Sequence, residues 1–144
     1  MKYLAIDSFL SDLDTLCKKP KNNCDSVRVD ICRLLQPAID SNEFILISDI
    51  LLHVEDENKH VLIKTRVQNS RMGGGKSKGF RLISLVSLIE NRACFLTVYP
   101  KKGKFAKENI TDNDIVILLQ EFIELSENDS LKIVDIYNDL EVIA

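Results

Sequence analysis

Residues 61–67 read Val-Leu-Ile-Lys-Thr-Arg-Val, and this stretch decides the fold class of the chain. Successive side chains of an extended strand point to opposite faces. One face would carry Val61, Ile63, Thr65 and Val67, and the other would carry Leu62, Lys64, Arg66 and Gln68. The alternation predicts a strand with one buried face and one basic face, as in a sheet that packs on a core from one side.

The part of the chain before this strand predicts a short strand and two helices. Residues 2–6 are a short apolar strand candidate, and apolar residues then recur at helical spacing from Phe9 to Cys17, with Ser8 as the N-cap. A second helical stretch ends before Pro37 and carries Val27, Ile31, Leu34 and Leu35. We expect the two helices to form an N-terminal α-hairpin.

The remaining segments add strands and one helix. Residues 44–54 are apolar enough for a strand, and residues 80–89 and 93–99 predict two more, joined by a turn at 90–92. Thr111 is placed to cap a helix whose apolar stripe is Ile115, Leu118, Leu119, Phe122 and Ile123. The tail, residues 130–144, fits helix or strand equally.

These elements predict an α+β fold. We expect an antiparallel sheet of about four strands, an N-terminal α-hairpin and a C-terminal helix. With 144 residues and 45% hydrophobic content, the chain is long enough for one domain and short for two, so residues 1–144 are expected to be a single domain with an undecided tail from about residue 126.

The composition and the first residues predict where in the cell the protein is found and whether its cysteines bind metal. Nothing in the sequence reaches the roughly 18 uninterrupted apolar residues of a spanning helix, and residues 1–10 lack the pattern of a secretion signal, which predicts a cytoplasmic protein without a membrane partner. The cysteines fit neither paired CxxC knuckles nor a Cys/His zinc pattern, so we expect reduced thiols and no metal site; they are Cys17, Cys24, Cys32 and Cys94.

The charges are segregated along the chain. The formal net charge is −3, yet residues 59–107 hold twelve lysines and arginines against one acid, Glu90, and the rest holds seven basic and twenty-one acidic residues. Such a basic segment predicts contact with a polyanion. The alternative is a solvated lysine face without a ligand.

A glycine-rich segment lies inside the basic region. Residues 69–79 contain four of the five glycines. A P-loop would need a glycine where Ser70 stands and a helix after Lys76, whereas a strand is predicted from Phe80, so nucleoside triphosphate binding is rejected. The segment is either a basic loop whose backbone, Lys76 and Lys78 meet phosphates, or a plain hairpin connection.

Four short motifs resemble the RelE/ParE superfamily, the toxins of type II toxin–antitoxin systems, and its RelE/HigB-like members in particular. They are Lys64-Thr65-Arg66-Val67-Gln68-Asn69-Ser70, Gly75-Lys76-Ser77-Lys78-Gly79-Phe80-Arg81-Leu82-Ile83, Tyr99-Pro100-Lys101, and Lys107-Glu108-Asn109-Ile110-Thr111. The resemblance covers about half of the chain, residues 61–124. This sequence departs from the family pattern at Lys78, where glycine is common, and in the longer 44–60 region and tail.

The resemblance implies an mRNA endonuclease, or mRNA interferase, that acts on RNA, often on the ribosome, without cofactor or metal, and that a cognate antitoxin protein silences. Cleavage by 2′-hydroxyl attack needs a base, cationic donors for the phosphorane and an acid. The candidate catalytic residues are Lys64, Arg66, Arg81 and Lys101. The candidate RNA-binding residues are Arg71, Lys76, Lys78, Tyr99, Lys102 and Lys104.

The candidates have roles that follow from their chemistry. Lys64 can act as base if neighbouring cations such as Arg66 favour its neutral form. The planar fork of Arg81 suits phosphate, and Lys101 is the candidate acid or second clamp. His60 shares the strand face of Lys64 and is a further, weaker candidate. The alternative function is non-catalytic binding, as in ParE-like inhibitors of DNA gyrase.

Overall fold

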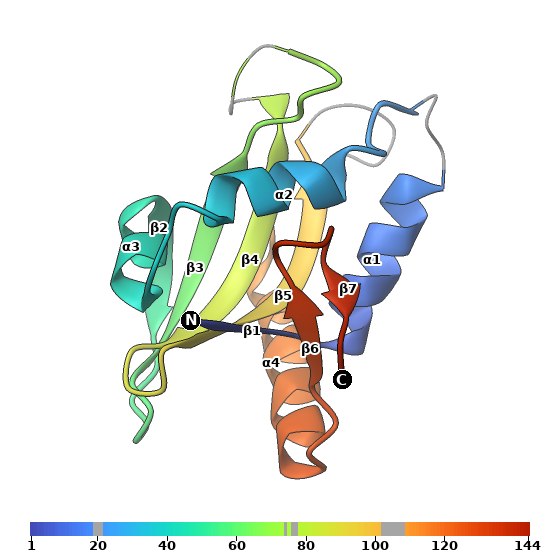
Figure 1. The fold of residues 1–144 in the computed structure, drawn as a ribbon. Helices are drawn as coiled ribbons and strands as arrows, with labels where there is room; N and C mark the ends of the chain where they lie inside the picture. Colours follow the sequence, from blue (N-terminus) through green and yellow to red (C-terminus); the bar gives the residue numbers. More distant parts are fainter. Residues whose placement is uncertain (19–21, 74, 76–77, 102–108) are drawn as a thin grey trace.

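A seven-stranded mixed sheet organises the chain (Figure 1). The computed structural model describes residues 1–18, 22–73, 75, 78–101 and 109–144. The strands lie in the order β2-β3-β4-β5-β1-β6-β7. In chain order the elements are β1 (Lys2–Ala5), α1 (Asp7–Cys17), α2 (Val27–Leu35), α3 (Ser41–Leu46), β2 (Ser48–His53), β3 (His60–Val67), β4 (Phe80–Ser87), β5 (Arg92–Pro100), α4 (Asp112–Glu127), β6 (Lys132–Asp135) and β7 (Glu141–Val142).

The strand predicted from residues 61–67 is confirmed as β3. Its predicted core face is buried, and the opposite face exposes Arg66 and part of Lys64. Leu62 on that second face is also fully buried. The reason is that α4 covers this part of the sheet, which brings the ring of Phe122 to 5.7 Å from that of His60.

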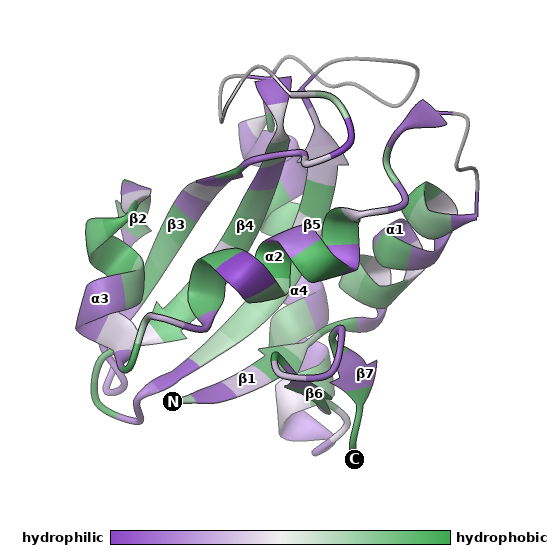
Figure 2. Ribbon diagram, turned by 45° about the horizontal axis from the view of Figure 1, so that its top comes forward, coloured by the Kyte–Doolittle hydropathy of each residue, from purple (hydrophilic) through white to green (hydrophobic). Residues whose placement is uncertain are grey.

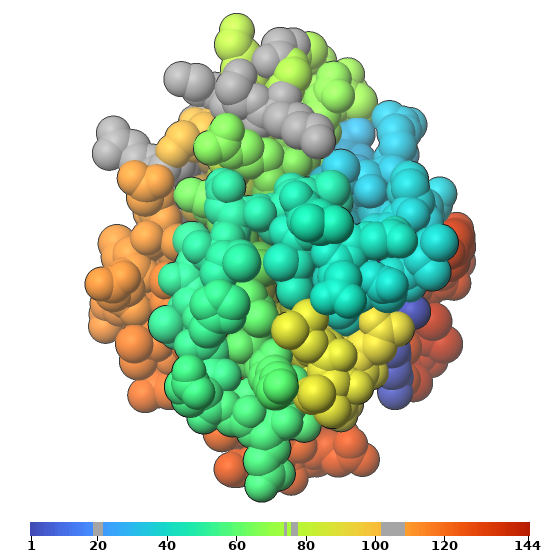
Figure 3. Space-filling view, turned by 90° about the vertical axis from the view of Figure 1, so that its left-hand side faces the viewer, coloured from blue at the N-terminus to red at the C-terminus, as the bar shows by residue number. Residues whose placement is uncertain are grey.

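Helices cover both faces of the sheet. Figure 3 looks onto the β2 edge and shows α4 on one side and α2 on the other. We call the side that carries Leu62, Lys64 and Arg66 the α4 face, and the opposite side the α2 face. On the α2 face, Phe44 of α3 lies 6.4 Å from Tyr3 between ring centroids. α1 lies along β5 beyond the end of β1, with Phe9 5.0 Å from Phe95.

The predicted sheet of about four antiparallel strands is wrong. The sheet has seven strands and is mixed, because β1 lies beside β5 and runs parallel to it, from Lys2 opposite Arg92 to Ala5 opposite Phe95. Three of the four residues of β1 are buried, which is typical of a central strand. The short strand expected at residues 2–6 is therefore β1, and it lies in the interior of the sheet, between β5 and β6.

Two local predictions are also wrong. Residues 44–54 do not form one strand: α3 occupies the first part, since the Asp40 carboxylate accepts a hydrogen bond from the Glu43 backbone N–H at 3.0 Å and caps that helix. Ser8 does not cap α1, because the N-cap residue is Ile6. Ser8 instead donates from its backbone N–H (3.0 Å) and its hydroxyl to the carboxylate of Glu121 in α4.

The tail, which fitted helix or strand, forms two strands that extend the sheet. β6 pairs with β1 and β7 pairs with β6, both antiparallel. Beyond β6 the chain turns over α2, where Gln36 donates to the carbonyl of Ile136 at 3.0 Å and Arg28 to the carbonyl of Asp139 at 3.3 Å. The tail therefore closes one side of the core, and Leu140 is fully buried there.

The apolar core lies between the sheet and the helices. Figure 2 shows hydrophobic colouring along the middle of β3, β4 and β5 and more hydrophilic colouring toward the upper ends of β3 and β4. Phe9, Phe44, Phe80 and Phe95 are fully buried. None of the described helices has the length and apolar character needed to cross a bilayer.

Candidate nucleic-acid interface

Three neighbouring strands bring basic residues together on the α4 face. Arg66 of β3 lies opposite Arg81 of β4, and Arg81 lies opposite Tyr99 of β5. Residues that face each other in an antiparallel pair project from the same side of the sheet, with Cβ atoms about 5 Å apart. Arg81 is therefore in the middle of a row that crosses three strands.

Two lysines complete this group on the diagonals of Arg81. Lys64 lies opposite Ile83, two residues from Arg81 on β4. Lys101 is the first residue after β5, and its backbone N–H donates to the carbonyl of Gly79 at 2.9 Å. Diagonal neighbours in a sheet lie about 7–8 Å apart, within reach of long side chains. We call Lys64, Arg66, Arg81 and Lys101 the cation cluster.

Arg81 is the buried centre of the cation cluster. Its exposed fraction is 6%, and its Nη1 donates to the carbonyl of Phe80 at 3.3 Å. Burial lowers the pKa of Arg81 from its ordinary value, and the positive charge of Arg66 lowers it further, whereas Tyr99 and Asp49 raise it. An arginine side chain stays protonated in proteins, so Arg81 presents a positive charge of restricted hydration.

The carboxylate of Asp49 in β2 forms an ion pair with Arg66 of the cation cluster. Asp49 lies opposite Lys64, and its Oδ2 is 3.9 Å from Nε of Arg66. Both side chains of this ion pair are more than half exposed, at 56% for Arg66 and 58% for Asp49. An exposed pair of this length is weak, so Asp49 offsets little of the positive charge of Arg66.

Tyr99 is in the row with Arg81, but its ring is packed. Its exposed fraction is 3%, and it lines a cavity of about 200 Å³ with Ile110, Leu118 and five other residues. Burial raises the pKa of Tyr99, while Arg81 lowers it. The phenol is therefore neutral at physiological pH and contributes to the floor of the site, with little ring surface for stacking against a base.

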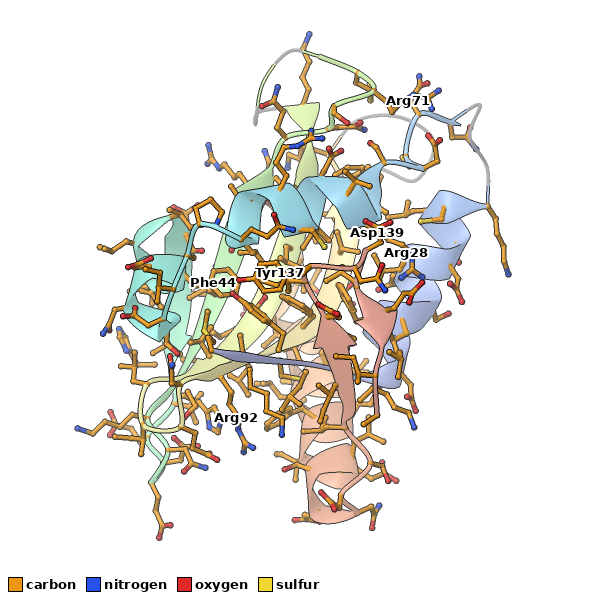
Figure 4. All side chains as sticks on the ribbon, in the orientation of Figure 1. Arg28, Phe44, Arg71, Arg92, Tyr137 and Asp139 are labelled. Atoms are coloured by element: carbon orange, nitrogen blue, oxygen red, sulfur yellow. The ribbon has the colours of Figure 1, made fainter. Side chains whose placement is uncertain are left out.

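The segment after β3 is held by the start of α2. The Asn69 side chain is buried; its Nδ2 donates to the carbonyl of Asn23 at 2.7 Å, and its Oδ1 accepts from the backbone N–H of Arg71 at 3.0 Å. The Arg71 guanidinium binds the Asp25 carboxylate at 2.8 Å. Arg71 therefore pairs with a residue just before α2 (Figure 4) and is not a member of the cation cluster.

Other candidates from the sequence are placed differently. Lys78 is exposed just before β4. Lys76, Lys102 and Lys104 lie outside the described residues. Arg92, which belongs to the basic segment, is at the opposite end of the molecule from Arg71 and pairs with Glu90 at 2.9 Å (Figure 4).

Gly79 allows the strands that carry the cation cluster to meet. A Cβ atom at this position would lie 1.9 Å from the carbonyl oxygen of Val67 and 3.0 Å from the backbone nitrogen of Asn69. The backbone of β3 therefore passes too close for any side chain here. Of the three described glycines in the 69–79 segment, Gly79 is required by the close approach of β3, whereas a Cβ at Gly73 or Gly75 would meet nothing within 4 Å.

His60 does not join the cation cluster. Its Nδ1 is 2.5 Å from Oδ2 of Asp56, its backbone N–H donates to Oδ1 of the same carboxylate at 3.0 Å, and Phe122 covers its ring. Those hydrogen bonds from His60 lower the pKa of Asp56. In the described ranges of the chain, no three His, Cys, Asp or Glu side chains group in a way that could hold a metal ion.

Sequence reasoning missed two acids near the site. Asp49 lies within residues 44–54, which were treated as an apolar strand, so it was not named as a site residue. The pairing of β2 with β3 places it opposite Lys64. Asp30 lies on the helical stretch 27–35 and is almost fully buried, with hydrogen bonds from Ser26 and Ser70. A charged residue on an amphipathic helix has no signal in the sequence that marks it as buried.

The chain matches no family model, no curated protein and no solved structure. The resemblance of the four motifs to a toxin superfamily therefore stays a prediction. What the geometry contributes is a set of four cations on one sheet face, in which Arg66 pairs weakly with Asp49.

Proposed function

We propose that the chain is an RNA-binding toxin of a type II toxin–antitoxin pair that cleaves mRNA on the cation cluster. The observation that carries this proposal is the register of β3, β4 and β5, which puts Arg66 directly opposite Arg81 and Lys64 and Lys101 on its diagonals. Cations this close repel one another, so their convergence has a cost that a bound phosphodiester would offset.

The cluster supplies the groups that cleavage by the ribose 2′-oxygen needs. Lys64 takes the proton from the 2′-hydroxyl, and the 2′-oxygen bonds to phosphorus. The fork of Arg81, supported by Arg66, stabilises the charge of the phosphorane. The bond from phosphorus to the 5′-oxygen then breaks, and Lys101 gives that oxygen a proton. The products are a 2′,3′-cyclic phosphate and a free 5′-hydroxyl.

Binding should be electrostatic and therefore dependent on salt. Each phosphate contact to a single strand contributes about 0.7 to the slope of log affinity against log salt concentration. Four cations that each contact phosphate predict a slope of up to about −3. The acidic rest of the chain repels RNA elsewhere on the surface, so binding is expected to be confined to the cluster.

Purified protein incubated with single-stranded RNA and EDTA tests the proposal. The expected result is cleavage that leaves cyclic phosphate ends, with no cleavage of a strand that carries 2′-deoxyribose. Arg81→Met keeps most of the aliphatic stem of the side chain without its charge and should lower the rate by at least about a hundredfold. Arg28→Met is the matched control, since Arg28 pairs with Asp14 on the surface away from the cluster.

Expression in cells gives a second, independent readout. The intact protein should arrest growth, Arg81→Met should relieve the arrest, and an adjacent gene for a small acidic antitoxin should protect. Unimpaired growth with the intact protein, together with stable RNA in the cleavage assay, would refute the proposal.

A second function has one observation in its favour, the burial of Arg81. With 6% of its surface exposed, Arg81 reaches a phosphate less easily than a fully exposed clamp would. A basic sheet face that binds without cleaving, as in ParE-like gyrase inhibitors, fits that observation. DNA breaks that depend on gyrase, without RNA cleavage, would support this function over the first.

A further inference from the structure

A cavity of about 450 Å³ lies between β1, β6 and the chain that follows α2. Figure 1 shows β1 and β6 side by side below α2. The lining of the cavity includes Tyr3, Ala38, Ile39, Ile136, Tyr137 and Ile143. We propose that this cavity binds a small uncharged molecule with an apolar body and a hydrogen-bond acceptor, which the Tyr3 hydroxyl contacts.

The Tyr3 hydroxyl is buried without a hydrogen-bond partner among the residues that the structure describes. Tyr3 is 5% exposed, and its ring stacks on that of Phe95 at 5.6 Å between centroids and lies 6.4 Å from that of Phe44. These contacts hold the ring in place, and the hydroxyl does not reach water. A buried hydroxyl without a partner costs free energy that phenylalanine at the same position would not. An acceptor from a ligand in the cavity removes that cost.

The protonation state of Tyr3 determines what the ligand must offer. Burial raises the pKa of Tyr3 to about 12, and the nearby Tyr137 phenol raises it as well. Tyr3 is therefore neutral at physiological pH and can donate one hydrogen bond, which a carbonyl oxygen accepts. The lining contains one basic residue, Lys2, and one acidic residue, Asp135, so it has no net charge. An ion in such a cavity would lack a matching charge, so an uncharged carbonyl compound is favoured.

The size and the lining of the cavity suit an apolar body. Its volume lies within the range of about 300–1,000 Å³ that is usual for small-molecule sites. Ile39 and Ile143 in its lining are 74% and 64% exposed, and Tyr137 is 75% exposed. Large apolar side chains that gather at one cavity lose water-exposed surface when a ligand covers them, which favours binding. The apolar part of the ligand therefore contributes to affinity together with the hydrogen bond.

Hydrogen bonds fix the walls of the cavity to each other. The Gln36 side chain donates to the carbonyl of Ile136 at 3.0 Å, which ties the end of α2 to the tail. The Asp135 carboxylate accepts from the backbone N–H of Tyr137 at 2.8 Å and holds the turn after β6. Walls that are held in this way need little ordering when a ligand binds. The Tyr3 side chain packs on Phe44 on the α2 face, opposite to the cation cluster, so ligand binding there is independent of the proposed function.

Titration of two fluorinated probes with the protein, followed by ¹⁹F NMR, tests the site. The probes are 4′-fluoroacetophenone and 4-fluoro-α-methylstyrene, which have nearly the same shape and differ by a carbonyl oxygen against a methylene group. A ketone of this size should bind with a dissociation constant of about 1 mM. The styrene lacks the acceptor and should bind about fivefold more weakly. Equal affinity for the two probes, or no binding of either, would overturn the proposal.

Tyr3→Phe is the decisive variant because it removes the hydroxyl and keeps the ring. It should bind the ketone about fivefold more weakly, with the affinity of the styrene, and it should fold at least as stably as the unmodified protein. Tyr99→Phe is the matched control, since it removes the hydroxyl of a buried tyrosine on the α4 face and should leave both affinities unchanged. Ala38→Trp places a bulky side chain in the lining and should abolish binding of both probes.

The outcomes separate the cavity from the RNA site. If Tyr3→Phe keeps the preference for the ketone, or if Ala38→Trp binds both probes as the unmodified protein does, the cavity is refuted as the binding site. Both variants should cleave RNA at the unmodified rate, because neither residue belongs to the cation cluster. An unmodified protein that binds the ketone but does not cleave RNA would refute the proposed function and leave the cavity site standing.

Discussion

Replacing Gly79 by alanine should strongly destabilise the protein and separate the strands that carry the cation cluster. The added Cβ would lie 1.9 Å from the carbonyl oxygen and 2.9 Å from the carbonyl carbon of Val67, and 3.0 Å from the backbone nitrogen of Asn69. All three atoms belong to the backbone, so no side chain can rotate away. Forced overpacking costs about 1–3 kcal/mol, and we expect about 3 kcal/mol here because two strands must part.

Urea unfolding of the two alanine variants of Gly79 and Gly73 measures this effect. Gly73 is the matched control: its φ is +66°, and a Cβ there meets nothing within 4 Å. Its replacement carries only the cost of the left-handed backbone, about 1 kcal/mol. The Gly79 variant should therefore unfold at a clearly lower urea concentration and bind RNA weakly. Equal midpoints for the two variants would refute the reasoning.

Three further predictions concern single groups. Thr111→Ala removes the capping box with Asp114 and should lower the free energy of unfolding by about 1 kcal/mol in urea titrations, whereas Thr111→Ser should retain most of it. Hydrogen bonds from His60 hold the pKa of Asp56 below its ordinary value of 3.8, so their contribution to stability is complete above that value and is lost as pH falls through the lower pKa of the folded state. Asp56→Asn should flatten this acid-side loss in unfolding curves recorded between about pH 6 and pH 2. The buried Tyr3 hydroxyl has no hydrogen-bond partner in the described part of the chain, so Tyr3→Phe should raise the free energy of unfolding by about 1 kcal/mol, and a lower melting temperature would contradict this.

Local patterns in the sequence predicted the elements whose signals are local. The alternation in residues 61–67 follows from the two-residue period of a strand, and the burial of Val61, Ile63, Thr65 and Val67 confirms the predicted core face, while Leu62 on the other face is buried under α4. Thr111 caps α4 as expected, and its hydroxyl accepts from the backbone N–H of Asp114 at 3.1 Å. Both features depend on a few neighbouring residues, so tertiary contacts did not change them.

The elements that were missed depend on partners far away in the chain. Residues 2–5 form a strand as their apolar character suggests, but nothing local shows that this strand pairs in parallel with residues 92–95. The tail becomes strand because β1 offers it an edge, with Leu4 opposite Ile133. The direction and number of strands in a sheet are set by such non-local pairs, which residue periodicity does not encode.

The sequence predicted only part of the candidate site, because its local patterns do not show which strands pair with one another. Alternation in β3 puts Lys64 and Arg66 on one face, and the register with β4 places Arg81, a candidate already named from the sequence, opposite Arg66. The basic segment as a whole does not gather in space, because Arg71 binds Asp25 and Arg92 binds Glu90. Charge counted along a sequence therefore overstates the charge of a site when individual cations have acidic partners nearby.

The burial of Arg81 is the feature that stability alone explains least. A guanidinium taken out of water on a central strand, opposite a second arginine, costs more than an apolar residue of similar size would at that position. The neighbouring residues of β4 are all buried, so an aliphatic side chain would continue the core there without that cost. Under the proposed function, the fixed position of this side chain lowers the entropic cost of binding a phosphate, whereas its burial limits how closely the phosphate can approach. The proposal would thus give a reason for a cost in stability that packing alone does not explain.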